Sequence, residues 1–103
     1  MIKPEEALLL FGKWKEEISP LRVVAWLASG HLSLERCFVR NFDSEVIALD
    51  LPDGSGAEIG IVGFGFEYGE PPEGKGEGSV RTVVAVRPGP KPRERILFIE
   101  LAR

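Results

Sequence analysis

The sequence is poor in the residues that most often build catalytic and metal sites. Its 103 residues include one cysteine, Cys37, and one histidine, His31. A single cysteine excludes an internal disulfide, so we expect a reducing compartment, the cytoplasm. One cysteine and one histidine cannot supply the clustered ligands of a transition-metal site, and we expect neither metal nor cofactor. A nucleophile with an adjacent base is also missing, because His31 lies in a turn-like segment where a solvated side chain is expected. The sequence therefore predicts a protein that is not an enzyme.

Long apolar runs are missing as well. The longest run near the start covers residues 7–11, which is too short to cross a bilayer. It follows Glu5 and Glu6 and not a basic segment, so we expect no signal peptide and no membrane association. Hydrophobic residues make up 44% of the chain and charged residues 28%, which is typical of a globular protein. The length predicts a single domain over residues 1–103.

A helix is predicted over about residues 4–18. Pro4 suits a first helical turn, and the two glutamates that follow it favour the positive end of the helix dipole. Ala7, Phe11, Trp14 and Ile18 recur at helical spacing. Gly12 weakens the helix by about 1 kcal/mol relative to alanine. The pair 19–20, Ser-Pro, ends the helix because the residue before proline avoids the α conformation.

Strands are predicted for most of the remainder, over about residues 21–102. The strand-like segments are 22–29, 34–42, 45–51, 58–68, 80–87 and 95–102. In segment 58–68 the apolar alternation slips by one residue beside Gly63, which indicates a bulge or sharp bend within one long strand. Segment 21–27 is apolar on both faces, so we expect it to be covered on both sides. Residues 69–79 form a polar, Pro- and Gly-rich stretch that we expect to be a mobile loop.

These elements predict a mainly-β fold with an N-terminal helix packed on a small, strongly bent antiparallel barrel of five or six strands. The segments LRVV (21–24), ASG (28–30), FD (42–43) and VIAL (46–49) resemble the first signature of the Sm-like family, in particular its bacterial RNA-chaperone branch. The resemblance implies an Sm-like barrel, a homo-oligomer that can be a ring, and contacts from Phe42 and Asp43 of the kind made by the family's third loop. Its ring edges would fall near residues 64–68 and 80–86.

The chain also departs from the Sm-like pattern. Cys37 stands where the family has a bend glycine, and Glu45 stands where it has an aromatic residue that stacks on a base. The Lys-His pair of the family is absent. The resemblance therefore implies the fold and the assembly, and it does not carry over the RNA site.

A second resemblance is to PilZ domains, which bind a cyclic dinucleotide. Their Arg-x-x-x-Arg motif is similar to Arg36 and Arg40, and their second motif is similar to Asp53 and Ser55, with Glu58 in place of its glycine. This resemblance implies a cyclic-dinucleotide sensor as an alternative function.

Charge is distributed unevenly along the chain. The net charge is −3, but residues 1–78 hold 7 Lys/Arg and 14 Asp/Glu, whereas residues 79–103 hold 6 and 2. A basic cluster on or beside the last predicted hairpin consists of Arg81, Arg87, Lys91, Arg93 and Arg95. Such a cluster is a candidate contact for nucleic acid or another anion, although no aromatic residue is interleaved with it in the sequence.

Together these features predict a non-catalytic, self-assembling small-barrel binding module. The expected partner is a second copy of the chain, because opposite charges on its two parts would face one another and unpaired strand edges would be covered. RNA binding through the basic C-terminal hairpin is the main alternative.

Overall fold

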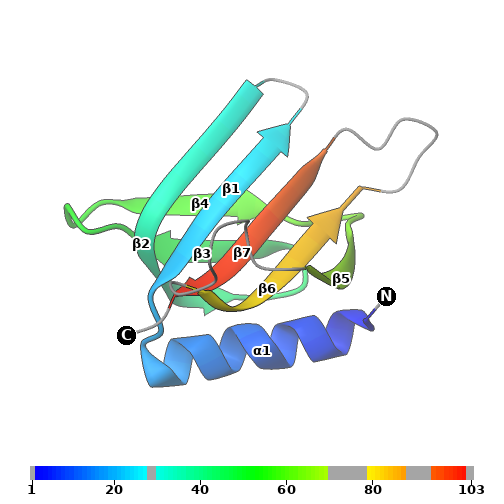
Figure 1. Ribbon diagram of the computed structural model, residues 1–103, viewed down its shortest axis with the longest axis horizontal. Coiled ribbons are helices and arrows are strands. Elements are labelled where there is room, and N and C mark those ends of the chain that lie inside the picture. Colours follow the sequence, from blue (N-terminus) through cyan, green and yellow to red (C-terminus); the bar gives the residue numbers. More distant parts are fainter. Residues whose placement is uncertain (1, 28–29, 70–78, 88–93, 102–103) are drawn as a thin grey trace.

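The protein consists of one helix followed by seven strands (Figure 1). A computed structural model describes residues 2–27, 30–69, 79–87 and 94–101, with residues 79–81 described through their backbone only. The helix is α1 (Pro4–Glu17). The strands are β1 (Leu21–Leu27), β2 (Gly30–Phe42), β3 (Val46–Asp50), β4 (Gly56–Gly60), β5 (Gly65–Gly69), β6 (Ser79–Val86) and β7 (Arg95–Leu101). The predicted mainly-β class is confirmed, and the predicted loop 69–79 falls largely outside the described residues.

All seven strands belong to one antiparallel sheet in the order β4-β3-β2-β1-β7-β6-β5. The prediction of five or six strands is therefore corrected to seven. The sheet is also open: β4 and β5 are its two edges, and the described strands do not close into a barrel. Strand β1 occupies the centre, between β2 and β7.

The prediction of one long bent strand over residues 58–68 was wrong. The slip in alternation marks the end of β4 and the start of β5, which lie at opposite edges of the sheet. A tight turn separates them, in which Gly63 has a φ of 80° and the Phe64 N–H donates to the Ile61 carbonyl at 3.1 Å. Because so short a turn joins the two edges, the sheet has to coil strongly on itself.

The coiling is concentrated in β2. Its first half pairs with β1 and its second half with β3, and the register with β1 shifts between the pairs Val23–Leu34 and Leu21–Cys37. Within that interval Arg36 has a φ of 51°, a left-handed conformation that bends the strand. Figure 1 shows the result, in which β3 and β4 cross behind β1 and β7 as a second layer.

The hydrophobic core lies between the two layers and α1. The helix buries Ala7, Leu10, Phe11 and Trp14, so its predicted apolar stripe is confirmed except at its last member. Ile18 is 67% exposed, because the helix ends one residue before it. Among the described residues, no helix is long and apolar enough to cross a membrane.

Ile18 is the C-cap of α1 and adopts the left-handed conformation, with a φ of 52°. Its N–H donates to the Lys15 carbonyl, and the N–H of Ser19 donates to the Trp14 carbonyl. A β-branched residue is disfavoured in this conformation, whereas glycine adopts it freely. We predict that Ile18→Gly raises the free energy of unfolding by about 1 kcal/mol in urea denaturation. If Ile18→Gly instead had a lower free energy of unfolding than the wild type, the packing of the Ile18 side chain would outweigh the strain of its left-handed backbone.

Cys37 is fully buried one residue after the bend of β2. Burial, and secondly the nearby Glu35 carboxylate, raises the pKa of its thiol to about 11. Because the thiolate is the reactive form, we predict that an aromatic disulfide reagent at mildly alkaline pH labels the native protein only as fast as the protein opens. The chain unfolded in urea should react immediately. Immediate labelling of the native protein would contradict the burial of Cys37.

Candidate binding face of the sheet

The central strand separates a buried face from an outward one. Leu21, Val23 and Ala25 of β1 point into the core and are fully buried, whereas Val24 and Trp26 point the other way and are half-buried. The expectation that β1 is covered on both sides therefore holds for one side only. We use the term outer face for the outward side chains of β1, β6 and β7 together with His31 and Ser33 of β2. In Figure 1 these strands form the front layer.

Residues of the outer face lie in register across neighbouring strands. One row runs from Ser33 through Val24 and Leu97 to Val84. Its three apolar members are half-buried and occupy the middle of the face. A salt bridge with a nitrogen–oxygen distance of 2.7 Å joins Arg22 to Glu35 at the border. An apolar centre with charged residues around it is the usual composition of a binding surface.

The neighbouring row brings together His31, Trp26 and Arg95 from β2, β1 and β7. The Cζ atom of Arg95 lies 4.7 Å from the centre of the Trp26 ring, which is a cation–π contact. The centre of the His31 ring is 5.4 Å from that of Trp26, with the rings tilted by 48°. Both flanking side chains are exposed. We call these three residues the His31–Trp26–Arg95 row, and its chemistry suits flat aromatic groups and anions.

The other members of the predicted basic cluster do not join this row. The guanidinium of Arg87 pairs with Glu94, and its Cζ atom lies 4.7 Å from the centre of the Phe64 ring. Arg87 therefore connects the end of β6 to the turn between β4 and β5, and its charge is neutralised. Arg81 lies in β6 with only its backbone described, and Lys91 and Arg93 lie outside the described residues. In the part of the chain that is described, Arg95 is the member of the cluster that the outer face presents.

Phe42 and Asp43 lie elsewhere, at the end of β2. Both border a hollow of about 260 Å³. However, Phe42 packs edge-on against Phe11 with ring centres 6.1 Å apart. Asp43 Oδ1 accepts the N–H groups of Glu45 at 2.7 Å and Val46 at 2.9 Å. These contacts hold the turn before β3 and lower the pKa of the Asp43 carboxyl, the bond from Glu45 having the larger effect. Both residues thus have structural partners.

The residues of the PilZ-like resemblance are engaged locally too. Arg40 Nε donates to Asp50 Oδ1 at 2.6 Å, and Asp53 Oδ1 accepts the backbone N–H of Ser55 at 2.9 Å. Arg36 occupies the bend of β2. The Arg40 guanidinium lies beside the turn that carries Asp53 and Ser55, since a Cβ on Gly56 would be 3.1 Å from its Nη2 atom, but its charge is paired with Asp50. The cyclic-dinucleotide alternative stays a prediction. Over the described ranges there is also no group of three or more His, Cys, Asp or Glu side chains that could hold a metal ion.

Trp26 and His31 were not among the predicted site residues. His31 was expected in a solvated turn, but it lies in β2 beside Trp26. Arg95, which makes the cation–π contact with Trp26, comes from the last strand. No local sequence pattern predicts that contact, because it depends on β7 pairing with β1.

The chain matches no protein-family model, no curated protein and no solved structure with which it was compared.

We predict that Asp43→Ala lowers the urea midpoint at neutral pH, because two backbone N–H groups lose their acceptor. The pKa of Asp43 is lower in the folded state than its ordinary value of 3.8. Its contribution to stability is therefore complete above that value and disappears as the pH falls through the lowered pKa. The difference in urea midpoint between the wild type and Asp43→Ala should therefore decrease as the pH falls through this lowered pKa. Glu45→Ala, which removes an exposed carboxylate from the same turn, is the control and should leave the midpoint nearly unchanged.

Proposed function

We propose that the protein is a non-catalytic binding module of Sm-like type that binds single-stranded RNA on its outer face. The observation that carries this proposal is the position of the Arg95 guanidinium over the half-exposed Trp26 ring, 4.7 Å from its centre. The Sm-like part is supported by the N-terminal helix, the bent β2 and the short turn between the edge strands. Strands β6 and β7 extend the chain beyond the compact core of that family.

The row offers the contacts that unpaired nucleotides require. Single-stranded RNA is recognised mainly by stacking of splayed bases on aromatic rings and guanidinium planes. Trp26 supplies an indole with an arginine already stacked on it, and His31 supplies a second ring beside it. The N–H groups of Arg95 can donate to a phosphate while the guanidinium plane remains stacked. A nucleotide therefore meets base-stacking and phosphate-binding groups within one row.

The surrounding charge limits the kind of binding. The protein has a net charge of −3, and Glu35 already neutralises Arg22 at the border of the face. A general attraction to phosphate backbones is therefore not expected. Binding should depend on stacking at one site, with few counterions released and a shallow dependence on salt.

Tryptophan fluorescence gives a direct test. Trp14 is 0% exposed, so a short single-stranded RNA should quench the emission of Trp26 selectively. Arg95→Ala should weaken binding about tenfold, since stacking and a phosphate contact are lost together. It should also reduce the slope of log K against log salt by about one.

The matched control is Arg40→Ala, which removes the same charge from a side chain paired with Asp50 away from the outer face. It should change the affinity less than about twofold. Equal losses for Arg95→Ala and Arg40→Ala would reject the row as the site. Failure of the wild type to bind RNA at low salt would reject the function itself. A DNA strand of the same sequence shows whether the 2′-hydroxyl contributes.

A further inference from the structure

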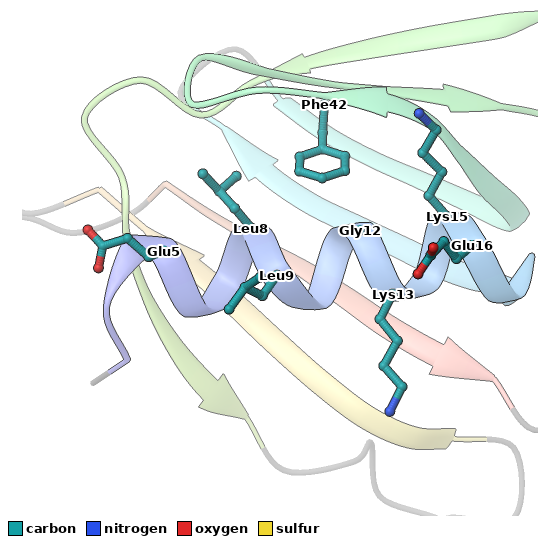
Figure 2. A pocket seen from close by; sticks show the side chains of 8 residues that line it. All are labelled: Glu5, Leu8, Leu9, Gly12, Lys13, Lys15, Glu16 and Phe42. Carbon is teal, nitrogen blue, oxygen red and sulfur yellow. The ribbon is translucent and has the colours of Figure 1, made fainter.

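Helix α1 borders a groove that lies beside its buried stripe. The groove has a volume of about 740 Å³ and runs between the helix and the end of β2. Leu8, Gly12 and Phe42 form its apolar part, and Figure 2 shows the Phe42 ring directly over Gly12. A Cβ atom on Gly12 would lie only 3.3 Å from Phe42 Cζ, so the glycine lets the ring approach the helix closely.

The Leu9 side chain forms an apolar projection next to the groove. Leu9 is 75% exposed and also borders the groove. Figure 2 shows Leu9 and Lys13 on the side of α1 away from Phe42. Glu5 and Lys13 lie four residues before and after Leu9, so these three side chains share one stripe of the helix. The stripe therefore has an acid, an exposed leucine and a base at equal spacing.

We propose that this surface binds a second copy of the chain, with the two α1 helices antiparallel about a twofold axis beside Leu9. Each Leu9 then enters the groove of Leu8, Gly12 and Phe42 on the other copy. Four residues along a helix correspond to about 6 Å, so the antiparallel arrangement places Glu5 opposite the Lys13 of the second copy, and the converse. The interface is isologous, as most dimer interfaces are.

The surface around Leu9 is complementary to itself. One surface contains both a projection and a groove that accepts it. The same surface carries opposite charges at equal distances on either side of the projection, so an antiparallel copy of the helix pairs both of them. A purely acidic or purely basic partner would leave one of the two charges opposed by its own sign.

The strand edges are less suitable for assembly than the Sm-like resemblance implied. The Ile2 N–H donates to the Phe66 carbonyl at 3.0 Å, so the outward edge of β5 is already occupied near its start. Residues 80–86, predicted as the other edge, lie in β6, an inner strand between β5 and β7. The expected edge near residues 64–68 therefore falls at an edge strand, β5, whereas the one near residues 80–86 does not, and the other edge of the sheet is β4. The proposed contact uses α1 instead of these edges.

Charge exchange tests the geometry. Light scattering from about 10 μM to about 1 mM should show the wild type passing from monomer toward dimer, as for a small interface. Glu5→Lys and Lys13→Glu should each weaken association at least about tenfold, because each places like charges opposite one another. An equimolar mixture of the two variants should associate again, and so should the double variant, because in both cases every pair is once more opposite in sign.

Glu58→Lys is the matched control, because it makes the same charge change at an exposed residue of β4, away from α1. It should associate as the wild type does, and circular dichroism should show all variants folded. A constant mass of 11.3 kDa over the whole range would overturn the proposal. Equal losses for Glu5→Lys and Glu58→Lys, or no recovery in the mixture, would also overturn it. Arg95→Ala should dimerise normally, which separates this result from the test of RNA binding.

Discussion

The packing of Phe11 is the interaction on which the rest of the structure depends. Its ring is fully buried and lies 5.1 to 6.1 Å, between ring centres, from Trp14, Phe42, Phe66 and Phe98. These rings belong to α1, β2, β5 and β7, so one side chain joins the helix to both layers of the sheet. Most of the contacts are edge-to-face, the favoured geometry for aromatic pairs. Truncation of a phenylalanine in such a site costs about 3–5 kcal/mol.

The position of Phe11 also decides what the helix exposes. With Phe11 and Trp14 directed into the core, the stripe of Leu9 has to face solvent. Gly12 is also required by the close packing of the helix on the sheet. Glycine costs a helix about 1 kcal/mol, but any larger residue would meet the Phe42 ring. The groove beside α1 is thus a consequence of how the helix packs on the sheet.

The helix and the mainly-β class could be predicted because both follow from local periodicity. The number of strands could not, because alternation does not say which strands pair: β4 and β5 read as one strand although they lie at opposite edges. Prediction of the site from the sequence is limited in the same way, because the site also depends on strand pairing. Arg95 was identified from clustered charge, but its partner Trp26 becomes its neighbour only through the pairing of β1 with β7. Arg87, in the same cluster, is neutralised by Glu94, a nearby residue in the sequence.

The two proposed surfaces are separate, and this matters for affinity. The outer face lies on the front layer in Figure 1, whereas α1 runs below the strands and packs on β2 and β5. A dimer formed through α1 therefore keeps both of its His31–Trp26–Arg95 rows accessible. Under the two proposals, the row of a single copy would bind an RNA strand weakly, because the protein has a negative net charge. Two rows held in one dimer would bind a strand that reaches both at a higher effective concentration, which requires no additional contact. Self-association would then compensate for the scarcity of positive charge on each copy.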